Sequence, residues 1–337
     1  MYKVVLDVMG GDFAPSSTLK GAELALKKFP ELHLYLVGKK SVLKSWEGRK
    51  RVSLYYTEEV VKMEESPKAA LKKKKEASIF KGLELIKNKE AQAFVSAGNS
   101  GAIVGGAIFI LGRLEGVRRP AIATLLPSLK DPFILIDAGA NVDSKPFDLL
   151  QFGVMGSIFL EKVCGRKNPK IALLSIGEET GKGNILVKKA HQFFIESNLN
   201  YVGNIESRDI FWGDVDVVVC DGFIGNICLK LSEGLAEAIL EMLKNEVKNS
   251  FIYLLGMKLA KGALKSFRKK ADWREYGGAP LLGVKGNVII AHGRSDAVAI
   301  ENAIKVAINS IKFNLVNRLE NAIAETLEVE EKNEFKL

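Results

Sequence analysis

Six short segments rich in Gly, Asn, Asp and Ser hold most of the residues that could carry out chemistry in this chain. Each follows a stretch of apolar, β-branched residues that predicts a strand. Ligands bind outside the carboxyl ends of strands in an open parallel sheet, so six such segments at one edge favour a small-molecule site over ordinary turns. The segments are residues 7–12, 96–101, 137–141, 175–184, 221–226 and 292–296.

One of these segments has the composition of an anion-binding helix start. Ser96-Ala-Gly-Asn-Ser-Gly101 leads directly into the apolar stretch 102–111, which predicts a helix. Glycines let backbone N–H groups approach a ligand, and the helix dipole favours negative charge there. A plain N-cap role is the alternative for Ser100. The sequence predicts a phosphate site at four consecutive residues, Gly98, Asn99, Ser100 and Gly101.

The segment around Lys182 matches the nucleotide-binding P-loop only in part. Ile176 stands where the first Gly should be, and Gly183 replaces the Ser or Thr that would bind magnesium. Nucleotide hydrolysis is therefore disfavoured, although Lys182 can still meet a phosphate as a point charge. The segment that begins Gly10-Gly11 does not fit G-x-G-x-x-G, so a dinucleotide site is not supported.

Histidine and cysteine are few, with three of each. The chain has no H-E-x-x-H motif, no G-x-S-x-G elbow and no C-x-x-C pair. These absences argue against a serine-hydrolase triad, a cysteine zinc site and a disulfide framework, and they favour a reduced, cytosolic protein. Only His292 follows a predicted strand at the loop edge, where a structural and a catalytic role are both open.

The loops must be positioned by the elements around them. Short β-branched stretches alternate with helical patterns, which indicates an α/β fold with a mostly parallel sheet covered on both faces. Hydrophobic and charged fractions of 47% and 26% exclude a disordered or fibrous chain. The predicted strands are 3–8, 32–37, 52–56, 93–96, 121–126, 133–137, 170–176, 200–204, 217–220 and 287–291. Predicted helices include 17–29, 67–88, 100–112, 147–164 and 184–196. We expect one unit over 1–330 and a frayed acidic tail over 328–337.

Positive charge is concentrated in residues 244–275, where nine basic residues face three acidic ones, although the whole chain carries only +9. The segment predicts a projecting amphipathic helix or short helical hairpin that contacts a membrane or a partner. An ordinary surface helix is the alternative, and nucleic acid is disfavoured because aromatic residues do not alternate with the charges. The apolar face comprises Ile252, Leu255, Leu259, Ala263 and Phe267, and the basic face Lys258, Lys261, Lys265 and Arg268.

The uncharged stretch from residue 91 to residue 112 is long enough to cross a bilayer. Its polar segment 96–101 would place irregular backbone in hydrocarbon, so a buried strand, a turn and a buried helix fit it better. Met1 leads straight into a predicted strand, so we expect no signal peptide.

The motifs, taken in order, are similar to those of one family. The chain resembles the PlsX-type phosphate acyltransferase family of bacterial phospholipid synthesis nearly end to end. Ser100 stands where the family usually has Thr, and Lys72 lies near a usual Arg. The matching segments are Asp7-Val-Met-Gly-Gly-Asp12-Phe-Ala-Pro15, Ser96-Ala-Gly-Asn-Ser-Gly-Ala102, Asp137-Ala-Gly-Ala-Asn141, Ile176-Gly-Glu-Glu, Asp221-Gly-Phe-Ile-Gly-Asn226, Leu229-Lys230, Tyr276-Gly-Gly-Ala-Pro280-Leu-Leu-Gly-Val-Lys-Gly286 and Asp296-Ala-Val-Ala-Ile-Glu-Asn302.

The resemblance implies transfer of a long-chain acyl group from acyl carrier protein to inorganic phosphate, giving acyl phosphate for phospholipid synthesis. It implies a three-layer α/β/α, Rossmann-like fold, a homodimer, and no metal or organic cofactor. The implied partners are acyl carrier protein, inorganic phosphate and the membrane acyltransferase that next uses acyl phosphate. The carrier protein is strongly acidic, which suits the basic segment 244–275, as does an anionic membrane surface. We expect a cytoplasmic protein reversibly associated with the inner face of the cell membrane.

Roles for single residues follow from this chemistry. We place Asn226 and His292 at the acyl carbonyl or the departing thiolate. Lys230 or Lys182 would supply positive charge. A further set should hold the loops by hydrogen bonds and close backbone packing, namely Asp7, Gly10, Gly11, Asp12 and Asn141.

Two other functions remain open at this point. The first is a short-chain phosphate acyltransferase that uses acyl-coenzyme A. The second is a non-catalytic membrane adaptor that recruits acyl carrier protein through residues 244–275. The full set of polar loops argues against the adaptor, which would not need them.

Overall fold

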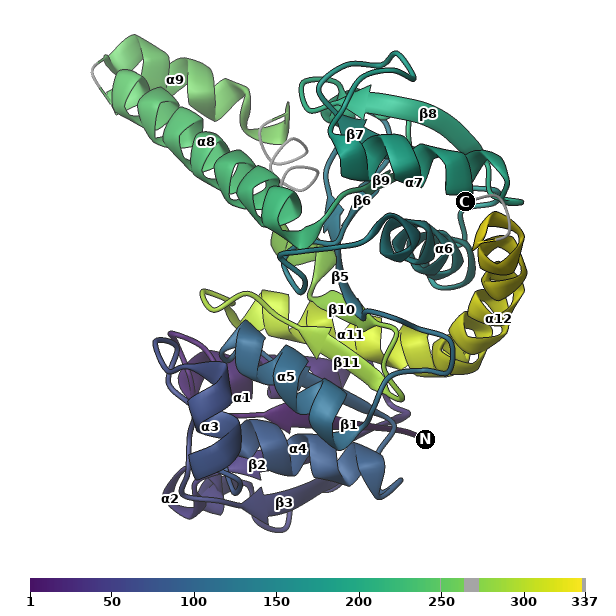
Figure 1. The fold of residues 1–337 in the computed structure, drawn as a ribbon. Helices are drawn as coiled ribbons and strands as arrows, with labels where there is room; N and C mark the ends of the chain where they lie inside the picture. The colour runs from purple at the N-terminus through teal and green to yellow at the C-terminus, as the bar shows by residue number, and fades with distance from the viewer. Residues whose placement is uncertain (249, 264–272, 335–337) are drawn as a thin grey trace.

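A single twisted sheet of eleven strands forms the centre of the molecule (Figure 1). The computed structural model describes residues 1–248, 250–263 and 273–334. The strand order is β3-β2-β1-β4-β11-β10-β5-β6-β9-β7-β8. In chain order the strands are β1 Tyr2–Asp7, β2 Leu32–Gly38, β3 Val52–Tyr56, β4 Ala93–Ser96, β5 Ala121–Leu126, β6 Phe133–Ile136, β7 Ile171–Ser175, β8 Tyr201–Glu206, β9 Val217–Val219, β10 Ala279–Leu282 and β11 Asn287–Ile290.

Helices cover both faces of this sheet, which confirms the predicted α/β fold. The helices are α1 Ser16–Lys28, α2 Lys40–Leu43, α3 Pro67–Lys73, α4 Ser78–Lys87, α5 Ser100–Ile110, α6 Pro146–Lys162, α7 Ile185–Ile195, α8 Gly222–Lys248, α9 Phe251–Leu259, α11 Ala297–Lys312 and α12 Leu315–Glu334. The prediction of one helix over 67–88 was wrong. Lys74 leaves the helix after α3 and its ammonium binds Glu65 at 2.6 Å.

The sheet is mostly parallel, as predicted, since seven of the ten strand pairs among the described residues are parallel. The three antiparallel pairs lie together in the middle, where β10 and β5 join β11 to β6. Three reversals in a row mean that β6, β9, β7 and β8 run opposite to β1, β2, β3, β4 and β11. The expectation that all six polar loops lie at one carboxyl edge was therefore wrong.

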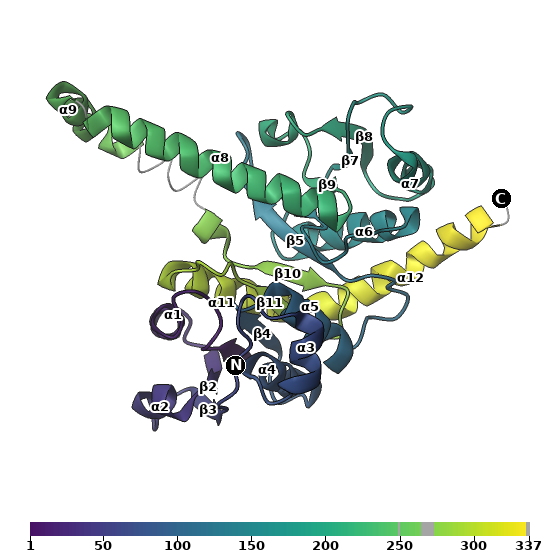
Figure 2. The same cartoon turned by 60° about the vertical axis from the view of Figure 1, so that its left-hand side comes forward.

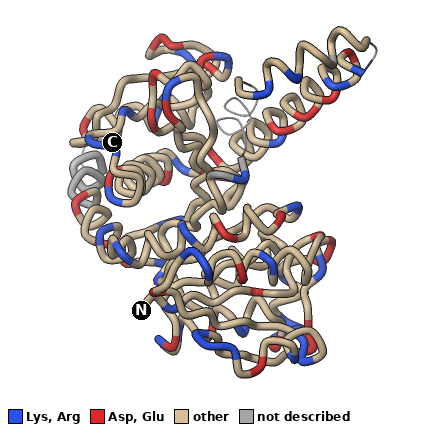
Figure 3. The backbone as a smooth tube through the Cα atoms, turned by 180° about the vertical axis from the view of Figure 1, so that it is seen from behind, with Lys and Arg blue, Asp and Glu red and all other residues tan. Residues whose placement is uncertain are grey.

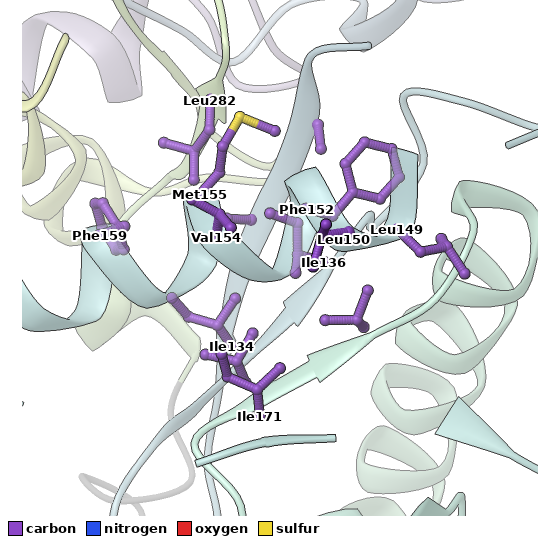
Figure 4. Packing of buried hydrophobic residues seen from close by; sticks show 14 of the residues in the cluster. Ile134, Ile136, Leu149, Leu150, Phe152, Val154, Met155, Phe159, Ile171 and Leu282 are labelled. Atoms are coloured by element: carbon purple, nitrogen blue, oxygen red, sulfur yellow. The ribbon is translucent and has the colours of Figure 1, made fainter. Parts of the chain in front are cut away.

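Apolar packing explains why the strands are hydrophobic on both faces. Figure 4 shows the cluster in which Phe152 and Met155 of α6 pack on Ile134 and Ile136 of β6. These side chains have no exposed surface or nearly none. At about 25 cal/mol per Å² of buried apolar area, such clusters supply the main stabilisation of the fold. They make the sheet a rigid base for the loops at its ends.

Helices α8 and α9 form a hairpin that projects away from the sheet (Figures 1 and 2). Helix α8 begins at Gly222, where it is buried against the sheet, and it continues without a break to Lys248, so the helix that projects starts well before the predicted residue 244. Three predicted contact residues, Lys265, Phe267 and Arg268, lie outside the described residues.

The C-terminal helix α12 is helical to Glu334, so the structure differs from the expected fraying from residue 328. Its Glu- and Lys-rich sequence has good helix propensity. The expectation that residues 1–330 form one α/β unit stays a prediction.

The stretch from residue 91 to residue 112 forms β4, a tight loop and α5, as expected for a buried segment. Within the part of the chain that the structure describes, no helix combines the length and hydropathy needed to cross a bilayer.

Candidate functional site

Asn99 ties together two loops at the start of α5. Its side-chain Oδ1 accepts a hydrogen bond from the N–H of Ala102 at 2.9 Å, which caps the helix. Its Nδ2 donates to the carbonyl oxygens of Met63 at 2.8 Å and Glu65 at 3.0 Å. Asn99 is buried, and these bonds occupy its amide. The structure therefore gives the Asn99 side chain a positioning function where the sequence suggested contact with phosphate.

Ser100 and Gly101 occupy the first helical positions of α5 and are exposed. N–H groups in the first turn have no acceptor within the helix, so they can bind an anion. Gly98 differs, because it is buried and its N–H already donates to Ser96 Oγ at 3.0 Å. Of the four predicted phosphate residues, Ser100 and Gly101 are thus the two that lie exposed in the first turn of α5.

Asp7 joins the loop after β1 to the loop after β4. Ser96 Oγ donates to Asp7 Oδ2 at 2.7 Å, and the N–H of Met9 donates to Asp7 Oδ1 at 3.0 Å. Burial raises the pKa of Asp7, and the hydrogen bonds oppose that rise. A Cβ at Gly10 would lie 2.6 Å from the N of Gly98, so only glycine allows the two loops to approach this closely.

The loop after β1 also contacts the loop after β11, which carries His292. The N–H of Asp12 donates to the carbonyl oxygen of Gly293 at 2.8 Å. Gly11 has φ +104°, and a Cβ there would lie 3.1 Å from the same oxygen. The loops after β1, β4 and β11 and residues 62–65 therefore form one connected group.

A second group of loops surrounds Asp137. Its Oδ1 accepts the N–H groups of Ile122, Gly139 and Ala140, and its Oδ2 accepts the N–H and the side-chain Nδ2 of Asn141. Burial raises the pKa of Asp137, and these donors oppose that rise. The Asn141 carbonyl in turn accepts the N–H of Gly222 at 2.8 Å. Asp137 and Asn141 thus fix the start of α8.

Asn226 lies in the first turns of α8, although the sequence placed it in a loop. A Cβ on Gly139 would lie 3.4 Å from Asn226 Cβ, so this glycine keeps the space beside Asn226 open. Asp221 begins the helix early by accepting the N–H groups of Phe223 and Ile224, each at 3.0 Å. The predicted loop 221–226 is therefore mostly a helix start.

One face of α8 joins the two groups of loops. Glu233 Oε2 lies 3.8 Å from His292 Nε2, and Glu237 Oε1 lies 2.9 Å from Arg294 Nη1. Both partners belong to the loop after β11. Residues 226, 230, 233 and 237 follow one another at spacings of 4, 3 and 4 and so share a face. Sequence reasoning missed Glu233 and Arg294. The spacing would have indicated Glu233 had 221–226 been predicted as helical, whereas no sequence signal pointed to Arg294 in the loop after β11.

Lys230 is exposed on this face of α8, next to Glu233. Lys182, by contrast, is exposed in the loop between β7 and α7. β7 is six positions from β4 in the sheet, and Figure 1 shows the start of α7 and the start of α5 in opposite halves of the molecule. The structure therefore brings Lys230, Asn226 and His292 to one helix face and leaves Lys182 apart from Ser100.

Comparisons with known proteins show which family this chain is similar to. A family model described as "Fatty acid synthesis protein" matches residues 2–318. A protein of Thermodesulfovibrio yellowstonii named "Phosphate acyltransferase" is 48% identical over 336 residues, covering 98% of this chain and 97% of the relative. A protein of the same name from Halothermothrix orenii is 47% identical over 328 residues, covering 95% and 98%.

Solved structures show the same fold at low sequence identity. A phosphotransacetylase from Streptococcus pyogenes aligns with a TM-score of 0.60 and 17% identity, covering 92% of this chain and 94% of that one. A branched-chain phosphotransacylase from Enterococcus faecalis V583 also gives 0.60, with 15% identity and coverage of 92% and 99%. The family model and the nearly full-length relatives show that the chain belongs to the PlsX family of phosphate acyltransferases, enzymes of fatty acid and phospholipid synthesis.

Proposed function

We propose that this enzyme transfers a long-chain fatty acyl group from acyl carrier protein to inorganic phosphate, giving acyl phosphate for phospholipid synthesis. The observation that carries the proposal is the match of nearly the whole chain to relatives named phosphate acyltransferase. The exposed start of α5 and the polar face of α8 supply groups that suit the reaction.

The proposed reaction needs positioning and charge stabilisation more than a strong base. A phosphate oxygen attacks the thioester carbonyl carbon, the new C–O bond forms, the C–S bond breaks, and the carrier thiolate takes up a proton. Phosphate dianion is already nucleophilic, so donors that hold it and stabilise the oxyanion provide the catalysis. We assign phosphate to the N–H groups of Ser100 and Gly101, and we assign the positive charge that stabilises the reacting groups to Lys230 on α8. Asn226 and His292 face the acyl carbonyl or the departing thiolate.

Trapping of the product tests this function directly. The protein is incubated with phosphate and either palmitoyl-acyl carrier protein or acetyl-coenzyme A, and acyl phosphate is captured with hydroxylamine. We expect hydroxamate from the palmitoyl donor, dependent on phosphate. Product from the acetyl donor alone would indicate a short-chain phosphate acyltransferase. No product from either donor would favour a non-catalytic adaptor for the carrier protein.

The α8–α9 hairpin supports a proposal for where the enzyme works. Helix α9 exposes large apolar residues, among them Ile252 at 75%, Leu255 at 50% and Leu259 at 83%. Between residues 250 and 263 the charged residues are Lys258 and Lys261, both basic (Figure 3). A surface of this kind suits the anionic inner face of a cell membrane. We propose reversible attachment there from the cytoplasm, so that acyl phosphate passes to the next, membrane-bound acyltransferase.

Helix α8 also supports the proposed homodimer. Its far side exposes large apolar residues at helical spacing, opposite the face that meets the loops. A stripe of this length on a projecting helix is the surface that a second copy of the chain would cover. The residues are Ile227, Leu231, Leu235, Ile239 and Met242.

Replacing Leu255 and Leu259 with Glu is expected to weaken binding to anionic vesicles by at least about tenfold, because each Leu contributes roughly 1.5–3 kcal/mol when buried. Binding of the wild type should also weaken with salt and be weaker to zwitterionic vesicles. Co-sedimentation with vesicles measures both effects. Equal binding of wild type and variant would contradict membrane attachment through α9 and favour a dimer contact for this helix.

A matched control replaces Ile185 and Ile195 of α7 with Glu, because both are exposed by more than half and lie outside the hairpin. This variant changes charge and hydrophobicity equally and should bind vesicles like the wild type. Analytical ultracentrifugation of all three proteins in the absence of vesicles checks the homodimer, which each should form.

A further inference from the structure

His292 is held between its own loop and helix α8. Its Nδ1 accepts the backbone N–H of Arg294 at 3.1 Å. Its Nε2 lies 3.8 Å from Glu233 Oε2. The His292 side chain is 41% exposed and that of Glu233 is 31% exposed. The pair therefore lies at the surface, and Glu233 is the more buried of the two.

The hydrogen bond to Nδ1 decides which nitrogen carries the proton in the neutral ring. A nitrogen that accepts a hydrogen bond from a backbone N–H must present its lone pair, so the proton resides on the other nitrogen. That nitrogen is Nε2, which faces Glu233. A carboxylate favours an N–H directed toward it, so both neighbours select the same tautomer.

We infer that Glu233 is a positioning residue, which acts through His292 by holding its imidazole with the Nε2–H directed toward the face of α8. The inference rests on the proposed function, in which His292 serves the acyl carbonyl or the leaving thiolate. At 3.8 Å the Glu233 carboxylate lies beyond hydrogen-bond distance of Nε2, so it orients the Nε2–H without accepting it. The Nε2–H can then donate to developing negative charge with no prior rearrangement of the ring.

The charges around Glu233 make this arrangement dependent on pH. The groups that face it are Lys230 and Glu237 on α8, and His292 and Arg294 from the loop after β11. Burial raises the pKa of Glu233 and Glu237 raises it further, whereas His292, Lys230 and Arg294 lower it, with a net rise. Glu233 therefore becomes protonated at a higher pH than an ordinary glutamate. As the pH falls through that value, the carboxylate that holds His292 is lost.

The substitution Glu233→Gln tests the inference, because it keeps the size of the side chain and removes its charge. We expect kcat for acyl phosphate formation to fall by about tenfold or more while the KM for the acyl donor stays unchanged. The fall in activity on the acid side of the pH profile should shift in the variant, since Glu233 no longer titrates. Selective ¹⁵N labelling of histidine, with His292→Asn to assign the signals, should show the two ring nitrogens of His292 becoming less distinct.

Glu237→Gln is the matched control on the same helix face. It removes an ion pair whose two side chains are each about 60% exposed, so it should change neither kcat nor the His292 signals. Unchanged kcat, pH profile and imidazole signals in Glu233→Gln would overturn the inference. If the wild type forms no acyl phosphate, the proposed function fails, but the imidazole signals still show whether Glu233 holds the ring.

Discussion

Replacing Gly225 with alanine is expected to destabilise the protein by roughly 3 kcal/mol and to lower kcat by about a hundredfold. A Cβ at this position would lie 1.9 Å from the carbonyl oxygen of Asp137 and 3.1 Å from Cys220 Sγ. The first atom is backbone in a loop fixed by five hydrogen bonds, so helix α8 must move. Movement of α8 would displace Asn226 and loosen the contact between Glu233 and His292.

Gly234→Ala is the matched control, because Gly234 belongs to the same helix and a Cβ there would meet no atom within 4 Å. Alanine is a better helix former than glycine, so this variant should gain up to about 1 kcal/mol and keep its activity. Chemical denaturation and steady-state kinetics measure both effects. If Gly225→Ala matched the stability of Gly234→Ala, the close approach of α8 to the Asp137 loop would be refuted.

The second large effect is expected for Asp137→Ala, which should cost about 3–5 kcal/mol of stability. The carboxylate accepts five hydrogen bonds from buried or half-buried N–H groups, and each donor left without an acceptor costs about 1–3 kcal/mol. Asp137→Asn should also be destabilising, because the NH₂ group of the new side chain would face N–H groups that now donate to a carboxylate oxygen. The denaturant midpoint reports both losses.

Asp143→Ala provides the comparison for this experiment. Asp143 follows the same loop, but it is exposed, and exposed substitutions usually change stability by no more than about 0.5 kcal/mol. Equal midpoints for the Asp137 and Asp143 variants would show that the carboxylate of Asp137 does not organise the loop. A loss confined to Asp137 would show that its carboxylate organises the loop.

Most of the strands could be predicted from the sequence alone. Strands such as Val217–Val219 are continuous apolar stretches, because burial on both faces leaves no polar position. All ten predicted strands have a counterpart in the structure. Strand β10 was missed because Ala279–Leu282 contains a proline and lies between Gly278 and Gly283, a pattern typical of a loop.

Strand direction could not be predicted, and it decided which loops meet. A short strand has the same composition whether its neighbour is parallel or antiparallel, so nothing in Ala121–Leu126 indicates that it reverses the sheet. For this reason the sequence grouped Lys182 with Ser100, whereas the structure separates them. The pairing of Glu233 with His292 joins residues 59 positions apart and depends on how α8 crosses the loop after β11.

Helix α8 is continuous from Gly222 to Lys248, with Asn226 near one end and the α9 hairpin at the other. Each residue of an α-helix adds about 1.5 Å of length and about 100° of rotation. A deletion or insertion within α8 would therefore turn α9 relative to the site as well as move it. Seven residues return the helix to within about 20° of its original orientation, whereas two would turn α9 to the opposite side. Natural variation in the length of this helix should therefore occur in steps close to whole numbers of turns.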